Sequence, residues 1–314
     1  MSIELPNHSN GVTLNLDELL QYKSQSIRWV PPAKSLWSQL NGQHESAKKG
    51  RGMDFSEVRQ YQAGDDIRSI DWRVTARTGK AHTKLFSEER ELPVVLYLDL
   101  SKSMIFGSTL LLKSVQMAHF ASIVSWLTTA QKDRIGAVID TGSQLYEFKP
   151  SATTQSPLKI LQTLIELNNL AITDPAISEQ VPPQQTTMAS GLKALHRLCP
   201  KGSDIIFMSD FVRLNESDYS LFNQFTRHNR LRLVHFYDPL ECGQTDFKGN
   251  KKVTDGKKTQ WLNFSSKRDK DKLAQAFALK QAELKKLCLS LAIPYSAISS
   301  ARPLIEQISE NKHD

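Results

Sequence analysis

One acidic and two hydroxyl residues stand at alternate positions directly after a short apolar run. The apolar run covers residues 93–98, and Asp99, Ser101 and Ser103 follow it. Hard divalent cations take oxygen ligands, and Mg2+ in particular takes one or two carboxylates and keeps waters in its remaining positions. One carboxylate with two hydroxyls suits this preference. The pattern therefore indicates a site for Mg2+ or Mn2+.

The apolar run predicts the element that would position these side chains. Its composition is typical of a strand buried on both faces of a parallel sheet, and ligands of open α/β sheets bind beyond the carboxyl ends of the strands. Asp99, Ser101 and Ser103 would stand at such an end. In the alternative interpretation, Asp99 is only a turn residue and the two serines cap the following helix.

The Asp-x-Ser-x-Ser arrangement resembles the metal-ion-dependent adhesion site (MIDAS) of von Willebrand factor A domains. That resemblance implies a Thr just before a helix and an Asp after a later apolar strand. Thr186 and Thr187 precede a helix-like segment, with spacing to Leu192 that favours Thr186, and Asp210 follows the apolar run 205–208. The implied ligands of one Mg2+ or Mn2+ ion are Asp99, Ser101, Ser103, Thr186 and Asp210.

A second signal lies upstream, where acids, arginines and aromatic residues alternate densely over residues 52–77. The order Arg-x-Tyr-x-x-Gly-Asp-Asp-x-Arg-x-Ile-Asp-Trp, followed by Ala-Arg, resembles the signature of a bacterial family of unknown function whose members accompany MoxR-type AAA+ ATPases. The resemblance covers about residues 50–238. The signature positions are Arg59, Tyr61, Gly64, Asp65, Asp66, Arg68, Asp71, Trp72 and Arg77.

Physically, this segment predicts a framework of ion pairs, because the planar fork of arginine pairs bidentately with carboxylates. The expected pairs join Asp65, Asp66 and Asp71 to Arg68, Arg73 and Arg77. Gly64 would supply a turn and Trp72 a large apolar anchor. One alternative is a solvated charge run, which the interleaved apolar residues make less suitable. The other is a catalytic carboxylate cluster, but no Ser/His or Cys/His arrangement lies nearby to support hydrolysis.

Helical and strand-like segments alternate after Asp99, which predicts an α/β fold with a doubly wound, mainly parallel sheet. This Rossmann-like arrangement is also what the resemblance to von Willebrand factor A domains implies, and residues 145–148 would form an antiparallel edge strand. We expect an N-terminal arm and a small β-rich subdomain over residues 1–90. The main domain would cover residues 91–314, with a lysine-rich insertion near 246–272.

The composition limits the classes of protein. The 314 residues carry a formal net charge of +7, but no helix-turn-helix, zinc finger or aromatic RNA-binding motif accompanies the lysines, so we expect no nucleic acid partner. Three cysteines lie far apart and form neither a disulfide framework nor a zinc motif. No apolar run is long enough for a bilayer, which predicts a cytoplasmic protein without direct membrane insertion.

Two classes of function remain. In the first, the chain is a non-enzymatic, metal-dependent adaptor that acts with a MoxR-type AAA+ ATPase in chaperone-like remodelling, and a client or partner completes the metal shell with an acidic side chain. The ATPase would supply energy, since this chain has no phosphate-binding Gly-x-x-x-x-Gly-Lys-Ser/Thr loop. In the second, Asp99 is the nucleophile of a metal-dependent phosphatase or hydrolase, but Ser101 stands where a second carboxylate is needed.

Overall fold

The computed structural model describes residues 4–28, 53–62, 64–88, 93–173, 186–245, 247–254 and 259–310. Its contacts divide the chain into two compact units. The small unit is residues 41–91, and the large unit combines residues 1–40 with residues 92–314. None of the described helices is both long and apolar enough to cross a membrane.

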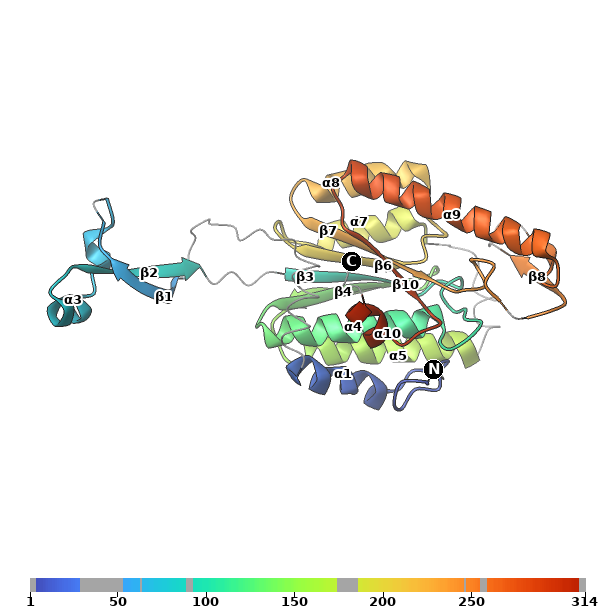
Figure 1. The fold of residues 1–314 in the computed structure, drawn as a ribbon, viewed down its shortest axis with the longest axis horizontal. Helices are drawn as coiled ribbons and strands as arrows, with labels where there is room; N and C mark the ends of the chain where they lie inside the picture. Colours follow the sequence, from blue (N-terminus) through green and yellow to red (C-terminus); the bar gives the residue numbers. More distant parts are fainter. Residues whose placement is uncertain are drawn as a thin grey trace. The chain divides into compact units, whose positions relative to one another are not determined.

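A sheet with strand order β10-β7-β6-β3-β4-β5 forms the centre of the large unit (Figure 1). Its strands are β3 (Pro93–Asp99), β4 (Arg134–Asp140), β5 (Leu145–Ser151), β6 (Asp204–Ser209), β7 (Arg230–Tyr237) and β10 (Tyr295–Ser299). All neighbours are parallel except β5, which pairs antiparallel with β4 at the edge. The predicted α/β class, the mainly parallel sheet and the antiparallel edge strand are confirmed.

Helices cover both faces of this sheet (Figure 1). One face carries α1 (Leu16–Arg28), α4 (Lys113–Ala130), α5 (Ser156–Thr173) and α10 (Leu304–Glu310), and the other carries α7 (Met188–Leu198), α8 (Tyr219–Thr226) and α9 (Lys267–Ser290). Alternate residues of β3 serve the two cores, with Leu96 and Leu98 in one and Val95 and Tyr97 in the other. The run before Asp99 is apolar at every position because both faces are buried.

The N-terminus differs from the predicted arm. Helix α1 belongs to the large unit, where Leu19 and Tyr22 are buried in the same core as α4. The hydroxyl of Ser122 donates to the carbonyl of Leu19 (2.7 Å), and Nε2 of His119 lies 2.6 Å from Oε1 of Glu18. Apolar residues spaced three apart give α1 a face that must be buried, and this face holds it on α4.

The small unit contains the antiparallel strands β1 (Met53–Gln60) and β2 (His82–Glu88). Between them lie a 3-10 helix, η1 (Ile67–Ser69), and helix α3 (Trp72–Thr78). The unit thus has the expected strands but also a helix. In the large unit, the lysine-rich region forms a hairpin of β8 (Asn250–Thr254) and β9 (Thr259–Asn263), and α9 begins within the predicted insertion.

Candidate functional site

Three neighbouring parallel strands end in an aspartate at the same edge of the sheet. Asp140 ends β4, Asp99 ends β3, and Asp210 directly follows β6. The chain runs outward from β3 through β4 on one side and returns to β6 on the other, so β3 and β6 flank the switch point where doubly wound sheets bind ligands. The sequence analysis did not include Asp140, although the apolar run that it ends carries the same signal as the run before Asp99.

Hydroxyl groups connect Asp99 to Asp210. The side chain of Ser101 acts to lower the pKa of Asp99, and that of Ser103 acts to lower the pKa of Asp210, so each hydroxyl lies near its carboxylate. The two serine oxygens lie 3.3 Å apart, and the backbone N–H of Ser101 also donates to Oδ1 of Asp99 (3.1 Å). Four of the five predicted metal ligands therefore form one continuous row of oxygens, which we call the oxygen row: Asp99, Ser101, Ser103 and Asp210.

The two threonines before α7 have different contacts. The hydroxyl of Thr186 donates to Oδ1 of Asp140 (2.7 Å), whereas the hydroxyl of Thr187 accepts from the backbone N–H of Ser190 and caps α7. Thr186 is thus the threonine that faces the strand ends, as its spacing suggested. Its described hydroxyl contact is with Asp140, and no direct bond to the oxygen row is found among the described residues.

An arginine that the sequence analysis missed binds two of the strand-end aspartates. One terminal nitrogen (NH2) of Arg213 lies 2.8 Å from Oδ1 of Asp99 and 2.8 Å from Oδ2 of Asp140, and the other (NH1) donates to the carbonyl of Thr186 at 3.1 Å. The side chain of Arg213 is 19% exposed, while those of Asp99 and Asp140 are fully buried. The guanidinium is therefore the solvent-facing member of this group.

A lysine, also missed, binds the other end of the oxygen row. Nζ of Lys113 lies 2.9 Å from Oδ2 of Asp210 and 2.5 Å from Oε1 of Glu241, and the lysine side chain is almost fully buried. Burial tends to raise the pKa of Asp210, but the Lys113 ammonium outweighs burial and holds this pKa below its usual value. Burial lowers the pKa of Lys280, although the nearby Asp210 and Glu241 oppose this shift. Asp210 is therefore ionised and already compensated.

Asp99 is compensated less fully than Asp210. Burial raises its pKa above the usual value; Arg213 opposes this rise, and the nearby Asp210 carboxylate adds to it. Its Oδ2 also accepts a hydrogen bond from Ser209 (2.6 Å). A pKa raised in this way means that further positive charge next to Asp99 would stabilise its ionised form.

The oxygen row fits a hard divalent cation by its donor types. Two carboxylates and two hydroxyls match the ligands of Mg2+, which fills its remaining positions with water. No group of three or more His, Cys, Asp or Glu side chains able to hold a metal lies within the described ranges. A cation here therefore depends on hydroxyl and water oxygens in addition to Asp99 and Asp210, and it shares these carboxylates with Arg213 and Lys113.

The signature residues of the small unit are arranged differently from the predicted framework. Asp65 pairs with Arg59 (2.7 Å), while Asp66 caps η1 and Asp71 caps α3, so the expected pairs with three downstream arginines are absent from the described part of the unit. The prediction failed because short aspartate side chains find backbone N–H donors locally before they reach an arginine. Hydrogen bonds from the backbone, chiefly from Val74, lower the pKa of Asp71.

Two other signature residues test the predicted turn and anchor. Gly64 has φ +109°, a conformation that favours glycine, in agreement with the expected turn. Trp72 is 68% exposed, so it is not an anchor within the described part of the small unit. Tyr61 is only half-buried and joins the unit through its backbone N–H, which donates to the carbonyl of Ala81 (2.9 Å).

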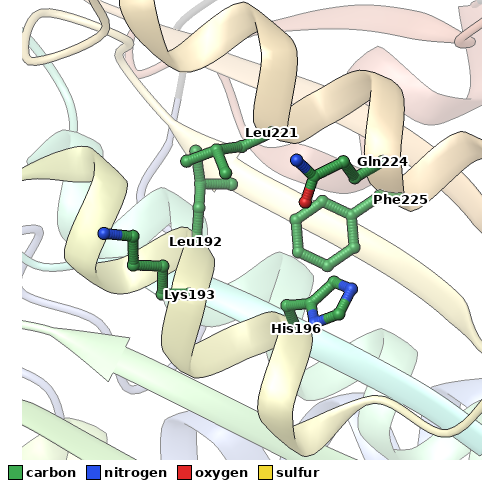
Figure 2. A pocket seen from close by; sticks show the side chains of 6 residues that line it. All are labelled: Leu192, Lys193, His196, Leu221, Gln224 and Phe225. Atoms are coloured by element: carbon green, nitrogen blue, oxygen red, sulfur yellow. The ribbon is translucent and has the colours of Figure 1, made fainter.

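A pocket of about 320 Å3 lies between α7 and α8 (Figure 2), and none of its lining residues belongs to the oxygen row. Its lining is Leu192, Lys193, His196, Leu221, Gln224 and Phe225. The ring of His196 lies edge-on to Phe225 at 5.6 Å. Its lining has no carboxylate or hydroxyl, so this pocket offers no oxygen ligands comparable to those at the strand ends.

Comparison with known proteins places most of the chain in one family. Residues 57–286 match the family described as "Protein of unknown function DUF58". Uncharacterized proteins of Mycobacterium bovis and Mycobacterium tuberculosis are 33% identical over 125 residues, covering 40% of this chain and 39% of each relative. The alignment thus spans about two fifths of the length of these relatives, and their names assign no activity.

Solved structures with similar segments are more distant. The conserved hypothetical protein BatB from Bacteroides thetaiotaomicron matches 70% of this chain and 98% of its own, with 11% identity and a TM-score of 0.38. An aerotolerance-related membrane protein from Bacteroides fragilis matches 70% of this chain and 99% of its own, with 10% identity and a TM-score of 0.41. These similarities are too low to transfer a function.

Proposed function

The chain belongs to the DUF58 family of proteins of unknown function, and from this premise we propose that it is a non-enzymatic protein-binding module whose binding depends on Mg2+ or Mn2+. The observation that carries the proposal is the oxygen row, in which Ser101 and Ser103 connect two buried carboxylates of adjacent strands. Its residues supply the oxygen ligands that such cations take. The raised pKa of Asp99, caused mainly by burial, supports a need for added positive charge.

We propose further that the large unit is a von Willebrand factor A-like domain. The Asp-x-Ser-x-Ser order, the later Thr186 and Asp210, and the position of Asp99 at the switch point of the sheet support this assignment. The adhesion sites of such domains bind an acidic side chain of a partner. The partner of this chain would therefore present an exposed Asp or Glu.

Each residue of the site has a part in this proposal. Asp99 and Asp210 would hold the cation with Ser101 and Ser103, while Thr186 holds Asp140 in place. A bound divalent cation supplies an open coordination position for the carboxylate of a partner. The more exposed Arg213 competes for Oδ1 of Asp99, so it must give up this contact when a cation binds. Cation binding and the position of Arg213 are therefore linked.

The partner system is proposed from the signature of the small unit. That signature resembles a family whose members accompany MoxR-type AAA+ ATPases, and we propose an adaptor role in chaperone-like remodelling or complex maturation. The hydrolase alternative gains no support from the geometry of Asp99. Both of its oxygens already accept hydrogen bonds, from Ser101, Ser209 and Arg213, instead of facing a substrate position.

Binding to a purified MoxR-type ATPase of the same organism tests this function. The dissociation constant is measured by surface plasmon resonance, in Mg2+ and in EDTA, for the wild type and for Asp99→Asn. We expect binding by the wild type in Mg2+ only, and a loss of at least about tenfold in Asp99→Asn, equal to about 1.4 kcal/mol. The matched control, Asp271→Asn on the exposed side of α9, should bind as the wild type does. Equal binding in Mg2+ and EDTA would contradict the proposal.

A further inference from the structure

The described part of the small unit leaves one face of a helix uncovered. Helix α3 has no buried residue, and Trp72 at its start is 68% exposed. Ile67, at the start of η1, is 64% exposed. Both η1 and α3 pack on β2, and the α3 contact includes the hydroxyl of Thr75, which accepts from the backbone N–H of His82 (3.1 Å).

The opposite side of α3 carries the exposed residues. Trp72, Arg73, Ala76 and Arg77 are all exposed, and residues four apart share one side of a helix. Arg68, in the preceding η1 turn, is exposed as well. We call the following set the α3 face: Ile67, Arg68, Trp72, Arg73 and Arg77.

Three aspartates close to the α3 face in sequence are used for local structure, whereas the arginines of the α3 face are not. Asp65 binds Arg59, Asp66 caps η1, and Asp71 caps α3 and lies 3.5 Å from Lys84. No ion pair joins an arginine of the α3 face to another residue within the described part of the chain. Residues 41–91 as a whole are close to neutral, with ten Lys or Arg against nine Asp or Glu. The positive charge is local to η1 and α3, because residues 67–78 carry three Arg against one Asp.

An exposed tryptophan contributes little to the stability of the small unit. A helix of seven residues is marginal by itself, and α3 depends on its Asp71 cap and on Gly79, which ends it at φ +69°. Single exposed apolar side chains are common on protein surfaces, so the exposure of Trp72 is informative only in combination with arginines that form no ion pair among the described residues. Trp and Arg are the residue types enriched where binding energy concentrates.

We propose that the α3 face is a docking surface for a protein partner with an acidic surface and an apolar depression that receives the Trp72 indole. Arginine forks pair bidentately with carboxylates, and the aliphatic Ile67 suits a protein surface. The phosphates of a nucleic acid also pair with arginine and an indole also stacks on bases, so a nucleic acid is the competing occupant that the test must exclude. This surface lies in the small unit and needs no metal.

Peptide binding by the full-length chain in EDTA tests this proposal separately from the metal-dependent function. The probe is a fluorescein-labelled amphipathic peptide of about 20 Glu and Leu residues, a length that spans roughly 30 Å as a helix. Fluorescence anisotropy compares the wild type, Trp72→Ala, Trp72→Phe and Arg73→Glu/Arg77→Glu. The control Lys251→Glu/Lys252→Glu reverses the same amount of charge on exposed β8.

We expect the wild type and the β8 control to bind with similar dissociation constants. Trp72→Ala and the double arginine variant should each bind at least about tenfold more weakly, and Trp72→Phe should retain most of the affinity. Unchanged thermal melting shows that each variant is folded. The proposal is overturned if the wild type does not bind, if the β8 control weakens equally, or if duplex DNA or phosphatidylglycerol vesicles bind more tightly through the same residues.

Discussion

Asp99 ends β3 and Asp210 directly follows the adjacent strand β6, yet the environments of the two aspartates differ. Lys113, itself almost fully buried, lies against Asp210 and lowers the pKa of this aspartate, although burial opposes the change. Asp99 has Arg213, and burial still raises its pKa. The difference means that an added cation stabilises Asp99 more than Asp210, so Asp99 is the residue whose substitution should affect cation binding most.

Substitution of Arg213 tests the competition at Asp99. Arg213→Gln leaves Asp99 and Asp140 without their shared cation, and breaking such a buried pair should lower the free energy of unfolding in EDTA by about 3 kcal/mol. Removal of the competitor should also tighten Mg2+ binding by roughly tenfold. Urea unfolding and calorimetric titration measure the two effects. The control Arg197→Gln replaces an arginine whose side chain is 71% exposed, and it should change neither the free energy of unfolding nor the Mg2+ affinity. Weaker Mg2+ binding by Arg213→Gln would refute the competition.

His235 on β7 should make the stability of the protein depend on pH. Burial lowers its pKa to about 3; Asp210 opposes this shift, and Lys280 and Lys113 add to it. The unfolded chain protonates this histidine below about pH 6.5 while the folded chain does not, so stability is lost as pH falls from there, at up to about 1.4 kcal/mol per pH unit. In the folded chain, Nδ1 of the neutral His235 ring lies 2.7 Å from the hydroxyl oxygen of Tyr295.

The variant His235→Gln isolates this contribution. Between pH 7 and pH 5, urea unfolding should show the wild type losing about 2 kcal/mol more than the variant, because only the wild type has the titrating group. Parallel loss in both proteins would mean that other groups cause the acid sensitivity.

At the scale of elements, the two threonines before α7 should affect different properties. Thr187→Ala removes the N-cap of α7 and should lower the free energy of unfolding by about 1 kcal/mol, with recovery in Thr187→Ser and no change in Mg2+ affinity. Thr186→Val removes the hydroxyl that holds Asp140 and should weaken Mg2+ binding. Chemical unfolding and calorimetric titration distinguish the two roles. A larger loss of Mg2+ affinity in Thr187→Ala would reverse this assignment.

The elements that carry the site were predictable because strands buried on both faces read as apolar runs. The strand before Asp99 follows from this pattern, and the same rule also identifies Asp140. Arg213 and Lys113 were not predictable, because their contacts join segments far apart in the chain.

For the whole molecule, the division into two units has a direct consequence. Among the described residues, neither of the two buried cores of the large unit includes one from 41–91. Replacing residues 41–91 by a short Gly/Ser linker should therefore preserve a cooperative thermal transition, with a melting temperature within about 4 °C of the wild type. Circular dichroism during heating measures this. Loss of cooperative unfolding would show that the large unit depends on the small one.

The central claim is that the strand ends of the large unit bind one divalent cation through the oxygen row. Isothermal titration of Mg2+ and of Mn2+ into the wild type, Asp99→Asn and the exposed control Asp271→Asn tests it most directly. We predict a single saturable site in the wild type and the control, and loss of that site in Asp99→Asn. No binding to the wild type, or equal binding to Asp99→Asn, would contradict the claim and leave Arg213 and Lys113 as the permanent counterions of these carboxylates.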